Sequence, residues 1–97
     1  MFTSKERSNL RAMAQNIKPV TQVGKGGISD ALVQSLSRAL EARELIKISV
    51  LNNVDDDARE IAENLADALK AEVVAVIGKK IILYRKSSRK DIDHIVF

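Results

Sequence analysis

The residues best suited to chemistry are the glycines and the lysine of one short segment. Gly24-Lys25-Gly26-Gly27 places three glycines in four residues, with a lysine at the predicted apex. Glycine leaves backbone N–H groups open to a ligand and turns where other residues cannot. A predicted helix follows directly, and the free N–H groups and dipole at a helix N-terminus favour an anion. The segment is a candidate phosphate-binding loop, although a tight strand-to-helix turn would also use glycines.

The spacing within this loop separates it from two common nucleotide-binding loops. The chain lacks the Walker pattern Gly-x-x-x-x-Gly-Lys-Ser/Thr, and Ser29 stands where a dinucleotide fingerprint needs its third glycine. The pattern Gly-x-x-Gly is similar to the loop with which KH domains clamp nucleotides, although that loop joins two helices. A nucleic-acid phosphate backbone therefore remains as the ligand, with no cofactor and no small-molecule substrate expected.

Basic side chains are concentrated in the two ends of the sequence. The net charge is +4 over residues 1–48, −5 over residues 49–77 and +4 over residues 78–97, which gives +3 overall. If the fold joins the two ends, they form a basic face that suits a polyanion, whereas solvated surfaces show similar charge blocks. Besides Gly24, Lys25, Gly26 and Gly27, the candidate contacts are Lys5, Arg7, Arg11, Lys18, Lys79, Lys80 and Arg85.

Groups for catalysis or metal binding are sparse. The chain has no cysteine, and its only histidine, His94, lies in the C-terminal tail without a recognisable partner. Asp55, Asp56 and Asp57 fit the positive end of a helix better than a metal ion. Tyr84 could stack on a base, but a partly buried cross-strand position explains it more simply. We expect no enzyme and no metal, and recognition of nucleic-acid shape and backbone with weak sequence preference.

Seven elements in the order αβαβαββ are predicted from hydrophobic periodicity and turn residues. A capping box, Thr3 with Glu6, begins a helix that extends to about residue 15, with an apolar face of Leu10, Met13 and Ala14. The other predicted elements are a strand over 20–23, a helix from 28 or 29 to 43, a strand over 45–51, a helix that starts near 55–57, and strands over 72–77 and 80–85.

Two turns complete this prediction. Asn52 and Asn53 form one, and Gly78-Lys79 closes a type II′ hairpin that makes the last two strands antiparallel. In the strand over 45–51, Lys47 and Ser49 alternate with apolar residues, which leaves one face of the sheet partly polar. We therefore predict an α/β (α+β) fold: two layers, αβαβαββ, with a four-stranded mixed sheet.

The chain is expected to be a single domain over residues 1–86, followed by a tail over 87–97 that its apolar residues could dock. No signal peptide and no membrane span is recognisable, so the expected location is the cytoplasm.

The sequence resembles the YhbY-like bacterial proteins, the single-domain form of the CRM domain (chloroplast RNA splicing and ribosome maturation). The resemblance is carried by the segments 18–19, 23–28, 39–47, 76–78 and 83–85. It implies a fold like the C-terminal domain of bacterial translation initiation factor three. It also implies RNA binding through the loop from Gly24 to Gly27, and association with precursors of the large ribosomal subunit during ribosome assembly. A lone domain fits this bacterial role better than the intron splicing of plant relatives.

Two hypotheses follow. In the first, a monomer binds ribosomal RNA through one basic surface made of the first helix, the glycine loop and the final hairpin, with the acidic third helix away from it. In the second, the protein is a protein-interaction adaptor that uses the acidic helix or the apolar tail ending at Phe97. A nucleotide-binding enzyme ranks behind both.

Overall fold

The computed structural model describes residues 2–51 and 57–97 and contains the predicted elements in the predicted order. They are α1 (Ser4–Ala14), β1 (Thr21–Val23), α2 (Asp30–Arg43), β2 (Leu45–Val50), α3 (Ala58–Leu69), β3 (Glu72–Ile77) and β4 (Lys80–Tyr84). The strands form one sheet in the order β1-β2-β4-β3, with β1 parallel to β2 and the other pairs antiparallel. The predicted αβαβαββ order and mixed sheet are confirmed. The predicted turn at Asn52 and Asn53, and the residues Asp55 and Asp56, lie outside the described residues.

Local signals position the ends of several elements as predicted. The Thr3 hydroxyl accepts a hydrogen bond from the Glu6 amide at 3.1 Å, and the Glu6 carboxylate accepts one from the Thr3 amide at 2.9 Å, so the capping box is confirmed. Ile77 pairs with Lys80 across the two-residue turn, where Gly78 has a φ of 57°. The predicted hairpin with glycine at its first position is therefore also confirmed.

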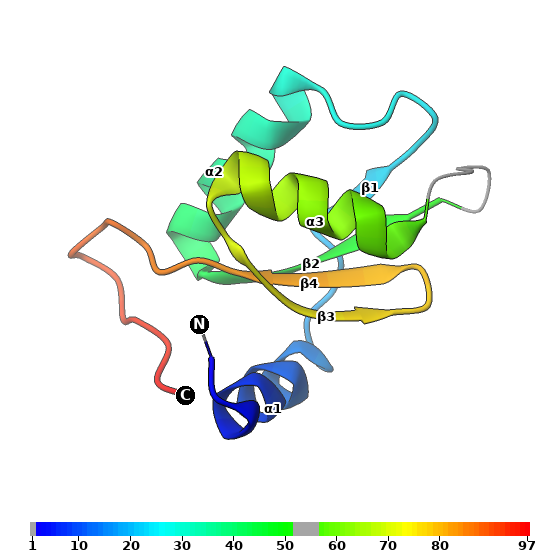
Figure 1. The fold of residues 1–97 in the computed structure, drawn as a ribbon. Coiled ribbons are helices and arrows are strands. Elements are labelled where there is room, and N and C mark those ends of the chain that lie inside the picture. Colours follow the sequence, from blue (N-terminus) through cyan, green and yellow to red (C-terminus); the bar gives the residue numbers. More distant parts are fainter. Residues whose placement is uncertain (1, 52–56) are drawn as a thin grey trace.

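Helices cover both faces of the sheet (Figure 1). α2 and α3 pack on one face, while Leu10 and Ala14 of α1 pack on the other against Leu45, Ile82 and Tyr84. The predicted two-layer arrangement is thus wrong. At one end of the sheet, the strand residues whose side chains point to the second face are apolar. A helix on this face must therefore bury them.

The other end of this second face is polar. Gln22 pairs with Ser49 and Ser49 pairs with Lys80, which places the three side chains in one row across β1, β2 and β4. The Lys80 ammonium donates to the Ser49 hydroxyl at 2.7 Å. The alternation predicted for β2 is correct here, because Lys47 and Ser49 face this side and Ile48 lies in the opposite core.

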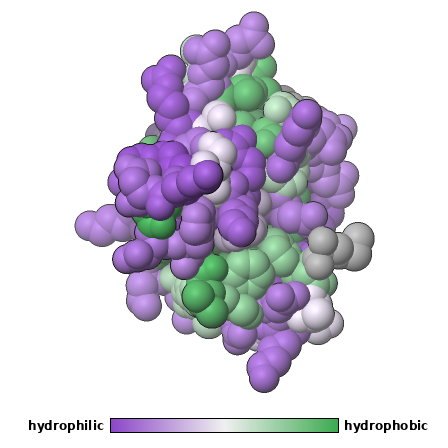
Figure 2. Space-filling view, turned by 90° about the vertical axis from the view of Figure 1, so that its left-hand side faces the viewer, coloured by the Kyte–Doolittle hydropathy of each residue, from purple (hydrophilic) through white to green (hydrophobic). Residues whose placement is uncertain are grey.

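Aromatic side chains gather at the end of the sheet that α1 covers. The ring centroids of Phe2, Tyr84 and Phe97 lie 4.9 to 5.6 Å apart in edge-to-face contacts. Tyr84 is only 8% exposed, which confirms its interpretation as a core residue. Met13 was predicted to lie on the apolar face of the first helix, but it is 40% exposed and lies outside the core. Both termini lie at this end (Figure 1), and Figure 2, seen from that side, shows an apolar area bordered by hydrophilic side chains.

Candidate nucleic-acid interface

The glycine loop projects from the end of the sheet where β1 and β2 finish. The Leu51 amide donates to the Val23 carbonyl at 2.9 Å, and a Cβ atom on Gly24 would meet the Leu51 side chain at 3.4 Å. No atom lies within 4 Å of the positions that Cβ atoms on Gly26 and Gly27 would take. The loop is therefore packed at its base and open at its apex.

One hydrogen bond closes the loop. The Gly27 amide donates to the Gly24 carbonyl at 2.9 Å, and Gly27 has a φ of 67°, which favours glycine. The amides of Lys25 and Gly26 make no hydrogen bond with any other residue that the structure describes. Both residues are exposed. These two amides and the Lys25 ammonium are accordingly available to an anion.

The N-terminus of α2 adds less to this site than the sequence suggests. α2 begins at Asp30 rather than at residue 28 or 29, because Ser29 is the N-cap and its hydroxyl accepts from the Leu32 amide at 3.1 Å. Ile28 stays outside the helix and is 37% exposed. The Asp30 carboxylate also places a negative charge at this helix end. The loop amides and Lys25 would therefore contribute more to the affinity for a phosphate than the helix dipole would.

The final hairpin reaches the same end of the sheet as the glycine loop. The Val50 amide donates to the Lys79 carbonyl at 2.8 Å, so the hairpin turn lies beside the end of β2. β2 separates β1 from β4, which puts the two turns about 10 Å apart across the sheet. Lys25, Lys79 and Lys80 are all exposed there. The structure therefore brings together the predicted loop and the predicted hairpin lysines (Figure 1).

Lys47 joins this region, although it was not among the candidate contacts. It lies on the same sheet face as Lys80, two residues along β2 from Ser49, which pairs with Lys80, and it is half-buried. Its backbone carbonyl accepts a hydrogen bond from the Val20 amide at 2.8 Å, so the chain just after Lys18 runs beside Lys47. Lys18 itself is exposed. The alternation of β2 was the signal that could have identified it. We call Lys47, Lys79 and Lys80 the lysine face.

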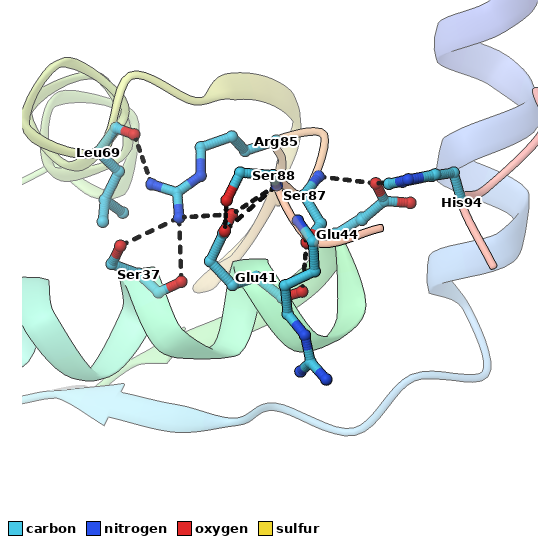
Figure 3. A network of polar contacts seen from close by, with 9 residues as sticks. Ser37, Glu41, Glu44, Leu69, Arg85, Ser87, Ser88 and His94 are labelled. Atoms are coloured by element: carbon cyan, nitrogen blue, oxygen red, sulfur yellow. Dashed lines mark hydrogen bonds and ion pairs between the residues drawn. The ribbon is translucent and has the colours of Figure 1, made fainter. Parts of the chain in front are cut away.

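Arg85 lies at the opposite end of β4 and binds other parts of the protein (Figure 3). Its guanidinium donates to the Leu69 carbonyl at 2.9 Å, to the Ser37 carbonyl and hydroxyl at 3.0 Å each, and to the Glu41 carboxylate at 3.3 Å. These bonds tie β4 to α2 and α3. A nucleic-acid contact would compete with them, so Arg85 is not part of the interface considered below.

The basic residues of α1 lie apart from the glycine loop. Arg7 donates to the carbonyl of Val74 at 3.0 Å and to that of Val73, and its guanidinium lies 5.5 Å from the centroid of the Phe2 ring. Phe2 contacts Tyr84, at the end of β4 remote from Lys80, so Lys5 in the first turn of α1 belongs to that remote end. Lys5 and Arg7 therefore lie outside the region that the glycine loop and the final hairpin form.

The acidic third helix does not lie away from the glycine loop, and that expectation is wrong. Glu60, Ile61 and Asn64 of α3 line a depression together with residues of the loop. The cause is topological, since β1 and β2 are parallel and α3 is the element that follows β2 in the chain. The Glu60 carboxylate disfavours a phosphate on this side of the loop.

His94 has a partner, contrary to expectation. Its Nδ1 lies 2.6 Å from a carboxylate oxygen of Glu44, which is 1% exposed and also accepts from the Ser87 amide at 2.7 Å (Figure 3). The Ile95 amide donates to the same carboxylate at 2.7 Å. Burial raises the pKa of Glu44, but hydrogen bonds from His94, Ser87 and Ile95 outweigh it and hold the pKa below the ordinary 4.5. We call this set the Glu44 anchor, because it fastens the tail to the end of α2.

Metal ligands do not cluster in the part of the chain that the structure describes, where no group of three or more His, Cys, Asp or Glu could hold an ion. Asp57 instead caps α3 and accepts from the Arg59 amide at 3.2 Å. None of the described helices combines the length and apolarity needed to span a membrane.

Comparison with known proteins adds a family to this geometry. Residues 2–85 match the family model for the CRS1 / YhbY (CRM) domain. The chain is 44% identical to "Probable RNA-binding protein YqeI" of Bacillus subtilis over 87 residues, which are 90% of this chain and 91% of that protein. It is also 44% identical to "Probable RNA-binding protein MJ0652" of Methanocaldococcus jannaschii over 86 residues, which span 87% of this chain but only 63% of that protein.

A solved structure agrees with this assignment. The solution structure of the hypothetical protein SAV1595 from Staphylococcus aureus superimposes with a TM-score of 0.78 at 45% identity, covering 94% of this chain and 95% of that one. The resemblance recognised from the loop and strand segments is thereby confirmed. The chain belongs to the CRS1 / YhbY (CRM) domain family.

Proposed function

We propose that this protein is a monomeric, cytoplasmic RNA-binding protein without enzymatic activity, and that its target is ribosomal RNA in precursors of the large ribosomal subunit. The observation that carries the proposal is the open apex of the glycine loop, where the amides of Lys25 and Gly26 bond to no described residue and Lys25 is exposed, at the same sheet end as the lysine face. Two similar proteins, YqeI and MJ0652, bear names that state RNA binding. The ribosomal target rests on the role that the family resemblance implies.

This interface would read the backbone of a folded RNA. Backbone amides and ammonium groups bind phosphate oxygens with little regard to the base. The aromatic residues Phe2, Tyr84 and Phe97 pack on one another at the remote end of the sheet, so they form no platform for stacking bases beside the glycine loop. We therefore expect recognition by shape, as suits a structured RNA.

Binding of a ribosomal RNA fragment, measured at several salt concentrations, tests this function. Replacing Lys25 by alanine removes one phosphate contact, so the log–log dependence of affinity on salt should become shallower by roughly 0.7–0.9. Affinity should fall for all RNA sequences alike, since a phosphate contact carries no base information.

Lys86→Ala is the matched control, because Lys86 is an exposed lysine next to Arg85 at the remote end of the sheet. It should bind RNA as the wild type does. Equal affinity and equal salt dependence for Lys25→Ala and the wild type would contradict the proposed interface.

The adaptor hypothesis has one supporting observation, the 88% exposure of Val96 in the tail. Crosslinking in growing cells separates the two functions. Crosslinks to large-subunit ribosomal RNA from residues of the glycine loop support the proposal, whereas protein crosslinks from the tail without RNA crosslinks support an adaptor.

A further inference from the structure

The outer edge of β3 carries a groove that is separate from the glycine loop. Arg7 and Arg11 of α1 and Arg59 of α3 line it, together with the β3 segment 73–76. α1 and α3 lie on opposite faces of the sheet, so the arginines approach this edge strand from both sides (Figure 1). Three positive charges from elements far apart in the sequence thus surround one strand edge.

The charge of this groove is not neutralised within the described part of the chain. Arg11 and Arg59 are exposed, and none of the ion pairs between described residues includes an arginine of the groove. Acidic residues of α3 and β3, Glu60, Glu63 and Glu72, are not among the residues that line it. An anion in the groove would therefore meet guanidinium groups that no ion pair with a described residue occupies.

A peptide strand is a poor occupant of this edge. Edge strands can pair with an added strand through their free N–H and C=O groups. Here Arg7 already donates to the carbonyls of Val73 and Val74, and the register with β4 shifts between Val73 and Ala75. Both features interrupt the regular row of groups that strand addition needs. The same guanidinium brings a fixed positive charge, which favours an anion.

The shape and position of the groove indicate an extended anion. The groove follows β3 to Val76, one residue before Ile77 and the hairpin turn that holds Lys79, so it continues toward the lysine face. No aromatic residue lines it, which argues against a stacked nucleotide. The planar guanidinium groups of Arg11 and Arg59 suit bidentate contacts with phosphate oxygens.

We propose that the RNA bound at the glycine loop and lysine face continues round the hairpin turn into this groove, where Arg11 and Arg59 contact its phosphates. The inference rests on the proposed function and extends it to a second surface. Arg7 acts there as a positioning residue, since its guanidinium is held by β3 carbonyls and contributes charge from a fixed place.

The double variant Arg11→Gln/Arg59→Gln tests the groove. Loss of two phosphate contacts should make the salt dependence of RNA affinity shallower by about 1.4 and weaken binding about tenfold near physiological salt. Arg38→Gln/Arg43→Gln is the matched control, because it removes the same charge from exposed positions of α2, outside both surfaces, and should bind as the wild type does. Equal binding by the two double variants would overturn the proposal.

Amide chemical shifts during titration with an RNA oligonucleotide give a second readout. The proposal expects shifts at Lys25 and Gly26 and also along Val73–Val76. Shifts at the loop alone would overturn the groove and leave the proposed function standing, whereas shifts at neither place would overturn both. If a polyglutamate peptide shifts Val73–Val76 and the RNA does not, the edge binds an acidic strand and the proposal is wrong.

Discussion

The two ends of the sheet use their polar groups in opposite ways. At the remote end, Glu44, Glu41 and Arg85 bond to other parts of the protein, and the described residues include no buried side-chain nitrogen or oxygen without a partner. At the other end, Lys25 and Lys79 are exposed and the glycine loop is closed by one hydrogen bond. The polar groups at the remote end stabilise the fold, while those at the glycine-loop end are available to a ligand.

β4 and the residue after it show this difference over a short stretch of chain. Lys80 begins the strand beside the hairpin turn and Arg85 follows its last residue, and both are basic. The Lys80 residue is exposed and its ammonium bonds only to the Ser49 hydroxyl in the described structure, whereas the Arg85 guanidinium bonds to Ser37, Glu41 and Leu69. Charge alone does not separate a ligand contact from a structural one, because the neighbours in space decide.

Glu44→Ala should produce the largest loss of stability. It leaves the amides of Ser87 and Ile95 and the His94 ring without their acceptor, and the tail must separate from α2 to hydrate them. We expect the free energy of unfolding to fall by about 2–4 kcal/mol, measured by urea denaturation. RNA affinity of the folded variant should stay within about twofold of the wild type. A loss below about 0.5 kcal/mol would refute the structural role of the Glu44 anchor.

The pH dependence of stability sharpens this prediction. Because the pKa of Glu44 is below the ordinary 4.5 in the folded protein, the unfolded chain binds its proton more readily. The stabilisation is complete above pH 4.5 and is lost as the pH falls through the lower folded value. Glu44→Gln should reduce this acid loss without abolishing it, since the hydroxyl of Ser88 and then Arg85 lower the pKa of Glu41 too. If the stability of Glu44→Gln falls with decreasing pH just as that of the wild type does, the role of Glu44 in acid unfolding is contradicted.

Gly27→Ala, at the glycine-loop end of the sheet, should produce a smaller loss of stability than Glu44→Ala. Gly27 has a φ of 67°, and an alanine in this left-handed region costs about 1–2 kcal/mol. No atom would clash with the new methyl group, so backbone strain is the whole expected effect. Thermal unfolding measures it against the wild type. A variant as stable as the wild type would show that the loop relaxes into another conformation at no cost.

Features that depend on a few neighbouring residues were predictable from the sequence. The Thr3 capping box, the Gly78 turn and the alternation of β2 involve partners no more than a few positions apart or a strict period of two. The glycine loop was recognisable for the same reason. Its surroundings were not, because Glu60 reaches it only through the parallel pairing of β1 and β2.

Contacts between distant segments account for what was missed. His94 meets Glu44 across 50 positions, and Arg7 meets Val73 across 66 positions. Glu44 also has a positive φ of 66° and is buried, two properties that nothing in the local sequence announces for a glutamate. The second covered face of the sheet escaped prediction because its apolar residues come only one or two at a time from β2, β3, β4 and α1.

Gly26→Ala should have the smallest effect on stability and a clear effect on binding. Gly26 does not have a positive φ, and a Cβ atom there would meet nothing within 4 Å, so the fold does not require glycine at this position. Stability should change by less than about 0.5 kcal/mol. A methyl group at the open apex would, however, stand between a phosphate and the amides of Lys25 and Gly26, so RNA affinity should fall while thermal unfolding stays unchanged.

Gly26→Ala and Gly27→Ala together then separate the effect of backbone strain in the loop from the effect of blocked access to its amides. If Gly26→Ala binds RNA as tightly as the wild type, the phosphate does not approach these amides, and Lys25 with the lysine face must account for binding alone.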